Sequence, residues 1–143
     1  MDDEGARQFA QARVARLATA DAEGRPHLVP IVFVVLGEHV WTAVDAKPKS
    51  SRALKRLANI TANPAVSIIV DHYDDDWSQL WWVRADGYAT VVDAVAAASG
   101  RALDALTSKY PQYALDRPAG PLIRVTVGRW SSWSHLGGKT VIV

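Results

Sequence analysis

The sequence predicts a mainly β domain of class α+β, in which about six antiparallel strands form a barrel-like sheet with two to three helices. Short segments rich in β-branched and aromatic residues recur along the chain, and short turns separate most of them. Few stretches show the periodicity of a helix. Strands joined by short turns pair in antiparallel fashion, so the sheet needs few long crossovers.

The first half of the chain supplies a helix, a run of strands and a second helix. In order, we expect a helix over 3–13, strands over 14–20, 27–36 and 39–44, and a loop followed by a helix within 45–64. The segment 27–36 is almost entirely apolar, which predicts a strand covered on both faces. Pro30 removes one backbone donor from this strand and therefore indicates an edge, a bulge or a bound ligand there.

The second half supplies further strands and one more helix. In order, we expect strands over 65–73 and 80–93, a helix over 94–110 and a strand over 121–130. Side chains of the long strand alternate between its two faces, which places Trp81 in the core and Trp82 on the polar face. Gly87 interrupts this strand. The sequence does not decide whether residues 137–143 form an ordered element or a loose tail.

Length and composition indicate a single domain over residues 1–143 that begins with a helical segment (1–12). The hydrophobic fraction of 49% and the charged fraction of 22% are ordinary for a soluble chain. The absence of cysteine excludes disulfides and thiolate metal sites. No apolar run approaches the ~20 residues that span a bilayer, and the start lacks the layout of a signal peptide. We therefore expect a cytoplasmic protein, and a net charge of +1 argues against general attraction to membranes.

Positive charge is concentrated around the expected second helix. Residues 46–70 contain no acidic residue, and their basic residues are Lys47, Lys49, Arg52, Lys55 and Arg56. On a helical wheel one face carries Arg52, Lys55, Arg56 and Asn59, and the opposite face carries Leu54, Leu57, Ala58 and Thr61. We therefore expect the helix to pack through its apolar face and to present a cationic stripe on the other.

The start of this helix is a candidate anion site. Ser50 or Ser51 is a suitable N-cap, and the first turn of a helix has free N–H groups and partial positive charge. Lysines just upstream and an arginine just inside would favour a phosphate or a carboxylate. Two alternatives remain open. One is a solvated basic face that serves solubility, and the other is a nucleic-acid surface, which the net charge and the four acids of 71–76 disfavour.

Three stretches of the chain together resemble a known family. They are VARLATADAEGRPHLVPIVFVV (14–35), KPKSSRALKRLANITANPAVSIIVDHY (47–73) and DDDWSQLWWVRADG (74–87). In order and spacing they resemble the split β-barrel flavin and deazaflavin oxidoreductases, the superfamily that includes pyridoxamine-phosphate-oxidase-like proteins. The branch that they resemble most is described as F420-dependent and is common in actinobacteria. The resemblance covers roughly residues 10–135 and implies a split β-barrel like that of FMN-binding proteins.

The resemblance also implies a homodimer with two cofactor sites at the subunit interface. It places Pro30, Ile31 and Val32 beneath the tricyclic ring of the cofactor. In the family, a basic turn and the start of a helix hold the cofactor phosphate. The resemblance implies that the corresponding residues here are Lys47, Lys49, Ser50 and Arg52, with Ser51 beside them. Lys55 and Arg56 are in positions to reach the acidic polyglutamyl tail that F420 has and FMN lacks.

The tryptophans and acids after residue 70 are a second group of candidates. Candidates for the wall of a substrate pocket are Trp77, Trp82, Trp130 and Trp133, although such rings more often belong to a core or an interface. Asp74–Asp76 predict a solvated loop, because consecutive carboxylates diverge too far for the alternative, a Mg²⁺ or Ca²⁺ site. His72 is either a proton donor or a structural residue.

These expectations converge on an F420(H2)-dependent oxidoreductase that transfers a hydride between the deazaflavin and a small conjugated substrate. No catalytic side chain is identified, because the cofactor itself carries this chemistry. One alternative is an FMN-dependent oxidoreductase of the same fold. Another is a non-catalytic protein that binds or sequesters F420. We expect no metal, nucleic-acid or membrane partner.

Overall fold

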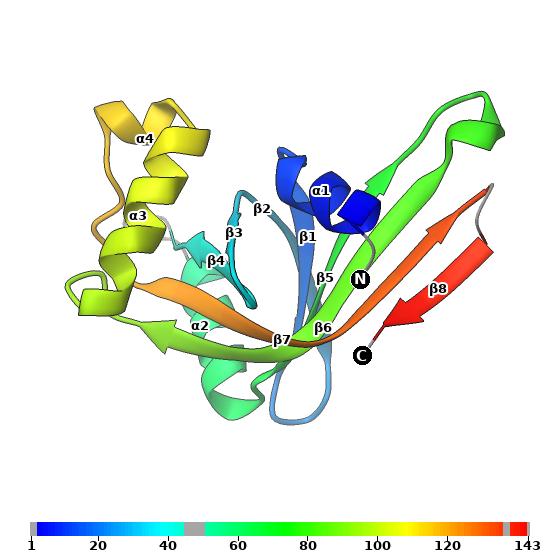
Figure 1. Ribbon diagram of the computed structural model, residues 1–143. Helices are drawn as coiled ribbons and strands as arrows, with labels where there is room; N and C mark the ends of the chain where they lie inside the picture. Colours follow the sequence, from blue (N-terminus) through cyan, green and yellow to red (C-terminus); the bar gives the residue numbers. More distant parts are fainter. Residues whose placement is uncertain (1–2, 45–50, 136–137, 143) are drawn as a thin grey trace.

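The computed structural model describes residues 3–44, 51–135 and 138–142, which form one sheet of eight strands with helices packed against it (Figure 1). The strands are β1 (Ala15–Ala20), β2 (Pro26–Ile31), β3 (Val34–Leu36), β4 (His39–Ala43), β5 (Ala65–His72), β6 (Trp81–Val92), β7 (Leu122–Ser134) and β8 (Gly138–Ile142). The helices are α1 (Asp3–Gln11), α2 (Ser51–Ala62), α3 (Ala97–Lys109), α4 (Gln112–Leu115) and the 3₁₀ helix η1 (Trp77–Gln79).

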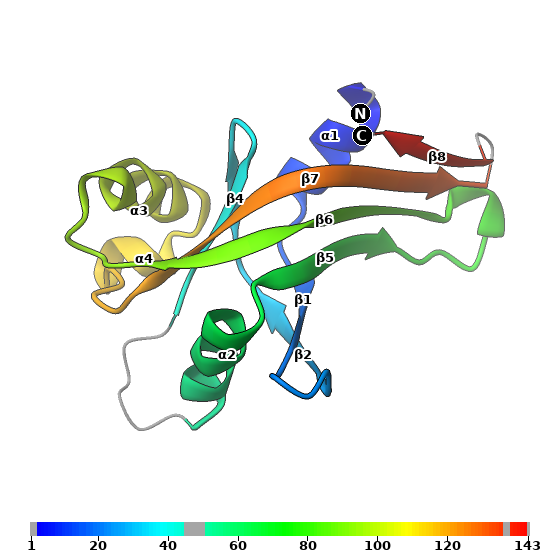
Figure 2. The ribbon, with the colours of Figure 1, turned by 90° about the horizontal axis from the view of Figure 1, so that it is seen from below.

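The strand order is β2-β1-β5-β6-β7-β4-β3, and every pairing in it is antiparallel. The strand β7 pairs with β6 along its length, and on its other side its first half pairs with β4 and its second half pairs with β8. The long strands β6 and β7 therefore run through both halves of the molecule (Figures 1 and 2). The predicted fold class, a mostly β split barrel with antiparallel strands, is confirmed.

The predicted run 27–36 is two strands rather than one. β2 pairs only with β1 and forms an edge of the sheet, as Pro30 indicated, whereas β3 pairs with β4. The prediction that this run is covered on both faces is wrong, since 65% of Leu28 is exposed. Residues 138–142 form β8, which pairs with the second half of β7.

Two clusters of buried side chains stabilise the sheet. The larger cluster joins α1 and α2 to β1, β5, β6 and β7, and it includes Val83 and Ala85, with Trp81 packed against it. The predicted inward face of β6 is thereby confirmed. The smaller cluster packs Leu103 and Leu106 of α3 against the sheet. No helix in the described residues is long and apolar enough to cross a membrane.

Gly87 lies where the backbone of β7 passes close to β6. The pairing of the two strands shifts register between Asp86 and Gly87, which matches the predicted interruption of the strand. A Cβ atom on Gly87 would lie 2.1 Å from the carbonyl oxygen of Thr126. Only glycine leaves room for this approach, because real Cβ atoms do not come so near a carbonyl oxygen.

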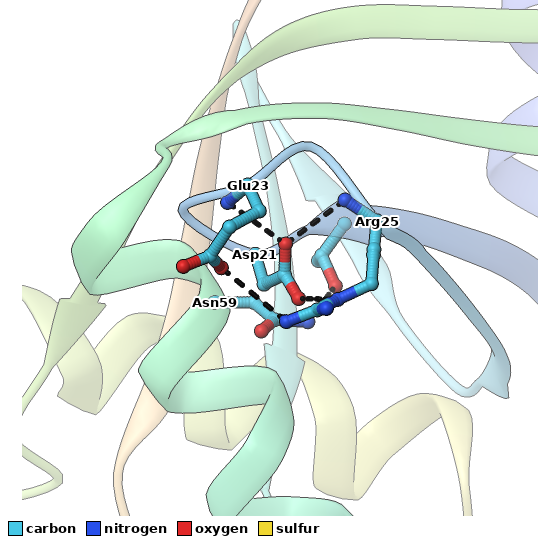
Figure 3. A network of polar contacts seen from close by, with 5 residues as sticks. Asp21, Glu23, Arg25 and Asn59 are labelled. Atoms are coloured by element: carbon cyan, nitrogen blue, oxygen red, sulfur yellow. Dashed lines mark hydrogen bonds and ion pairs between the residues drawn. The ribbon is translucent and has the colours of Figure 1, made fainter.

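The helix α2 packs through a different face from the one predicted. Asn59 and Ile60 are buried, whereas Ala58 and Thr61 are exposed. The Nδ2 of Asn59 donates a hydrogen bond of 3.1 Å to Oγ1 of Thr19 in β1, beside the Asp21–Arg25 turn (Figure 3). The predicted exposed stripe is therefore wrong at Asn59. A helical wheel assigns a polar residue to solvent and has no means of including a buried polar partner from a distant strand.

Candidate functional site

A groove of about 670 Å³ opens between the edge of the sheet, α2 and the segment that follows α3. Its floor comes from the end of β2, the residue after it, and β4: Pro30, Ile31, Val32, Thr42 and Ala43. Its other lining residues are Val14, Arg56, Gln112, Tyr113, Asp116, Arg117, Pro118 and Ala119. The structure thus brings together Pro30, Ile31, Val32 and Arg56, four of the residues that the sequence predicted to bind a cofactor.

The floor of the groove is mostly apolar, and its one side-chain hydroxyl is bonded to the backbone. Thr42 is buried, and its Oγ1 donates a hydrogen bond of 2.7 Å to the carbonyl oxygen of Val32. The ring of Pro30 carries no N–H group, and Ile31 and Ala43 are buried. The floor is therefore predominantly apolar, as is usual where a protein binds an aromatic ring system.

Arg56 contributes a buried guanidinium nitrogen to the lining of this groove. Its Nε lies buried without a hydrogen-bond partner in the described part of the chain. Burial also lowers the pKa of the Arg56 guanidinium, although an arginine keeps its charge in a protein. A buried N–H of a charged group without an acceptor is costly, so the groove suits a ligand that brings an anionic oxygen to Arg56.

The far wall of the groove is formed by residues that the sequence did not single out. Tyr113 on α4 packs edge-on against Tyr110, with ring centroids 6.2 Å apart. Nη2 of Arg117 donates a hydrogen bond of 2.9 Å to Oδ1 of Asp104 on α3. Arg117 thus adds a second guanidinium to the lining. The only signal for these residues was the run after the third helix, QYALDRP, which combines aromatic, basic and proline residues.

The remaining candidates for the cofactor phosphate are described only in part. Lys47, Lys49 and Ser50 lie outside the described residues. Ser51 and Arg52 belong to the first turn of α2, but their side chains lie outside the described part. Lys55 is exposed on α2, one residue before Arg56. Their role at the phosphate remains a prediction.

The four candidate tryptophans lie away from the groove, and none of them is among its described lining residues. Trp77 in η1 is 64% exposed at the tip of the β5–β6 connection, which Figure 1 shows at the opposite end of the sheet from α3 and α4. Trp82 faces Trp133 across β6 and β7 and lies 5.6 Å from the guanidinium carbon of Arg84. Trp130 packs edge-on against Phe9 in the core, with ring centroids 4.9 Å apart. Their role in a substrate pocket remains a prediction.

The acidic residues of the β5–β6 connection order their own loop. Oδ1 of Asp74 accepts a hydrogen bond of 2.7 Å from the amide of Asp76. Oδ1 of Asp76 accepts one of 3.1 Å from the amide of Ser78, and the two bonds to Ser78 lower the pKa of Asp76. Asp75 and Asp76 are exposed, as a solvated loop requires. The described residues contain no group of three acidic or histidine side chains placed to hold a metal ion. The imidazole of His72 stacks on Trp81 at 5.9 Å, which gives it a structural contact.

A second hollow, of about 610 Å³, lies on the outer face of the sheet over β1, β5, β6 and β7. Its acidic group is already engaged, because Asp86 accepts hydrogen bonds from Ser67 and, at 3.2 Å, from Nε of Arg84. Most of its other lining residues are small, among them Ala18, Ala20, Ala65, Gly87 and Gly128. Since none of its described side chains has a buried donor without a partner, the first groove is the stronger candidate.

Comparison with known proteins agrees with this fold. The family model for pyridoxamine 5′-phosphate oxidase matches residues 1–134. A conserved hypothetical protein from Mycobacterium tuberculosis is 24% identical, with a TM-score of 0.74 over 100% of this chain and 92% of that one. A heme binding protein from Mycobacterium smegmatis is 19% identical, with a TM-score of 0.78 over 99% of this chain and 57% of that one. An FAD-binding protein from Mesorhizobium loti is 20% identical, with a TM-score of 0.68 over 92% and 94%.

These identities indicate a shared fold and leave the ligand open, since the neighbours include both heme and flavin proteins. A comparison with curated proteins gives no significant match. The match over residues 1–134 covers nearly the whole chain and coincides with the split barrel described above. The chain belongs to the pyridoxamine 5′-phosphate oxidase family.

Proposed function

We propose that this protein binds the deazaflavin F420 in the groove and acts as an F420(H2)-dependent oxidoreductase, transferring a hydride to or from a small conjugated organic molecule. The observation that carries the proposal is the buried, unpartnered Nε of Arg56 beside the apolar floor of Pro30, Ile31 and Val32. A ligand with a flat ring and an anionic arm satisfies both features at once.

The residues of the groove bind and orient the ligand. When bound, a deazaflavin supplies hydride transfer at a carbon of its ring. The apolar floor packs against the ring and excludes water from one face of it. Arg56 binds an anionic group of the side arm. The hydrogen bond from Thr42 to the carbonyl of Val32 holds the Val32 backbone in place beneath the ring. This chemistry requires no nucleophilic side chain.

The choice of F420 over FMN depends on the charge of the chain around α2. Residues 46–70 contain five basic residues and no acidic one, and FMN offers a single phosphate to such a cluster. The several carboxylates of the polyglutamyl tail of F420 would engage more of these cations. We assign Lys47, Lys49, Ser50, Ser51 and Arg52 to the phosphate, and Lys55 to the tail.

Other ligands have weaker support. The FAD-binding neighbour favours a flavin, so FMN in the same groove is the alternative cofactor. The heme binding neighbour raises heme as a ligand, but no histidine is among the described residues that line the groove. A protein that binds F420 without turnover differs from an enzyme only in activity. Sustained reduction of any enone, quinone or tetrapyrrole by F420H2 would exclude it.

We also propose that two copies of the chain form a homodimer with the cofactor sites at their interface. Apolar and aromatic side chains on the outer face of the sheet support this, because Leu28 and Tyr88 are 65% and 66% exposed. Such side chains supply apolar area that a second copy of the chain can bury. Light scattering should give twice the chain mass of 15.6 kDa. A mass of 15.6 kDa at micromolar concentration would contradict the dimer.

Cofactor binding is tested by fluorescence anisotropy of F420 and by absorbance of FMN. We expect saturable, micromolar or tighter binding of F420 and weaker binding of FMN. Arg56→Met should weaken F420 binding by roughly tenfold to a hundredfold, because it removes a charge-assisted hydrogen bond. Arg101→Met, which removes an exposed guanidinium of α3, is the matched control. Lack of binding of both cofactors by the unmodified protein would contradict the proposal.

A further inference from the structure

The backbone between β2 and β3 is held by side chains instead of by a neighbouring strand. The amide of Phe33 donates a hydrogen bond of 3.1 Å to Oη of Tyr110, which is 77 residues away in the sequence. Nζ of Lys109 donates one of 3.0 Å to the carbonyl oxygen of Phe33. Together with the bond from Thr42 to Val32, these contacts give partners to the carbonyl of Val32 and to both main-chain polar groups of Phe33. Backbone groups in such a break would otherwise be buried without partners.

The hydroxyl of Tyr110 and the ammonium of Lys109 divide the neighbouring carbonyls between them. Oη of Tyr110 lies 3.1 Å from the carbonyl oxygen of Arg13 and 3.2 Å from that of Phe33, but it has one proton to donate. Since Lys109 already donates to Phe33, the hydroxyl is free to donate to Arg13. Nζ of Lys109 also donates a hydrogen bond of 2.9 Å to the carbonyl oxygen of Ala10. The end of α3 thus fastens both the end of α1 and the β2–β3 break.

Cation–π contacts reinforce the same cluster, which we call the Tyr110 cluster (Arg13, Phe33, Lys109 and Tyr110). Nζ of Lys109 lies 4.0 Å from the centroid of the Phe33 ring. The guanidinium carbon of Arg13 lies 4.7 Å from the centroid of Tyr110, and its Nη2 donates 2.9 Å to the carbonyl oxygen of Lys109. The Phe33 ring itself packs against Phe9, 5.2 Å away. The core therefore holds the Phe33 side chain, and the Tyr110 cluster holds its main chain.

The Tyr110 cluster lies directly behind the groove. The peptide that it holds follows Val32, a residue of the groove floor, and Tyr110 packs against Tyr113 of the far wall. We infer that Tyr110 and Lys109 are positioning residues that hold the two peptide groups of Phe33 (Tyr110 at its amide, Lys109 at its carbonyl) in the orientation that shapes the ligand-binding floor. The inference rests on the proposed function for the identity of the ligand, but the geometry of the floor can be measured without any ligand.

The test compares three variants by backbone NMR and by cofactor titration. Tyr110→Phe removes the partner of the Phe33 amide, so hydrogen exchange of that amide should accelerate at least about tenfold. The amide resonances of Ile31, Val32, Thr42 and Ala43 should move, and the Kd for F420 should rise by about tenfold. Lys109→Met should have the same effects. Lys109→Arg should return the exchange rate, the resonances and the Kd toward the values of the unmodified protein, because a guanidinium can donate to both carbonyls.

Ser99→Ala is the matched control. Ser99 is buried in the first turn of the same helix and its Oγ donates 2.7 Å to the carbonyl oxygen of Asp93. The variant therefore removes a buried hydrogen bond of α3 at the end opposite Tyr110. It should leave the Phe33 amide, the floor resonances and the Kd unchanged. Equal effects from Ser99→Ala and Tyr110→Phe would show that α3 acts only as a scaffold and would overturn the inference.

Each remaining outcome decides the inference. Unchanged exchange at Phe33 with unmoved floor resonances in Tyr110→Phe would overturn it, and so would faster exchange with an unchanged Kd. Failure of the unmodified protein to bind F420 and FMN would contradict the proposed function instead. The ligand-free resonances and exchange rates would then decide the positioning role. Should Tyr110→Phe fail to fold, the pair Lys109→Met and Lys109→Arg decides in its place.

Discussion

The two ends of the long sheet differ in how their polar groups are satisfied. At the end with α3 and α4, a groove with an apolar floor contains a buried guanidinium nitrogen of Arg56 without a partner in the described chain. At the other end, the rings and acids find partners nearby: Trp130 on Phe9, Trp82 beside Arg84, and Asp76 capping η1. The buried Oγ of Ser131 has no partner in the described chain, but it is uncharged and lines neither hollow. The tryptophan-rich end is conspicuous in the sequence, but the end where a buried guanidinium nitrogen without a described partner lines a groove is the better candidate for a ligand site.

A region rich in tryptophan is therefore not necessarily a ligand-binding site. A tryptophan ring can bury a large apolar area by packing within its own sheet, and no cavity results. A buried charged donor without an acceptor has no such internal solution. The predictions below test this difference, in order of decreasing expected effect.

The largest effect on stability is expected at Gly87, in the part of β6 and β7 that connects the two ends of the sheet. Gly87→Ala would place a Cβ 2.1 Å from the carbonyl oxygen of Thr126, so the paired strands must separate. We expect a loss of about 3 kcal/mol in the free energy of unfolding. Gly100→Ala is the control, because its Cβ meets no atom within 4 Å and a helix favours alanine. Urea unfolding of both variants checks the prediction, and equal stability of the two would contradict it.

A core role for Trp130 predicts a stability effect at the tryptophan end. Trp130→Ala removes a partly buried ring from Phe9, which should lower the free energy of unfolding by about 2–3 kcal/mol. The Kd for F420 should stay within about twofold of the original value, since the ring lies in the core. Thermal unfolding and anisotropy measure the two quantities. A large loss of F420 binding by a variant of unchanged stability would assign Trp130 to the site instead.

A charge reversal in the groove should have the opposite signature. Arg56→Glu should weaken F420 binding by at least about 2 kcal/mol, or roughly thirtyfold, because repulsion replaces a charge-assisted bond. The free energy of unfolding should change little, because Arg56 has an unsatisfied donor in the absence of ligand. Arg101→Glu should leave both quantities unchanged. An unchanged Kd in a folded Arg56→Glu variant would place the ligand elsewhere.

The smallest effect is expected from pH. Burial and the neighbouring Arg13 lower the pKa of Lys109 to about 8 from its ordinary 10.5. Between these values the unfolded chain holds a proton that the folded chain has lost, so the contribution of Lys109 to stability rises with pH. Burial raises the pKa of Tyr110, whose contribution falls above pH 10. The rise therefore occupies pH 8–10, and Lys109→Met should remove it in urea unfolding across this range. The same rise in the variant would contradict the assignment.

The sequence predicted the strands well because their signals are local. Alternation placed Val83 and Ala85 in the core, and Pro30 and Gly87 marked an edge and an interruption that the structure contains. These signals depend on neighbouring residues, so no knowledge of the fold was needed.

The errors came from contacts between distant segments. The buried face of α2 depends on Thr19, which lies 40 residues from Asn59. The break after β2 depends on Tyr110, and the far wall of the groove depends on the way α4 returns over the sheet. No local pattern contains such information. Arg56 was found through its charge, but its burial, which makes it informative, was visible only in the fold.

The most direct test of the central claim is an NMR titration of the protein with F420 that follows the Nε–H resonance of Arg56. This resonance should shift to saturation together with the amides of Ile31, Val32 and Ala43. Saturable binding that leaves these signals in place and moves those of Tyr88 and Gly128, beside the second hollow, would contradict it.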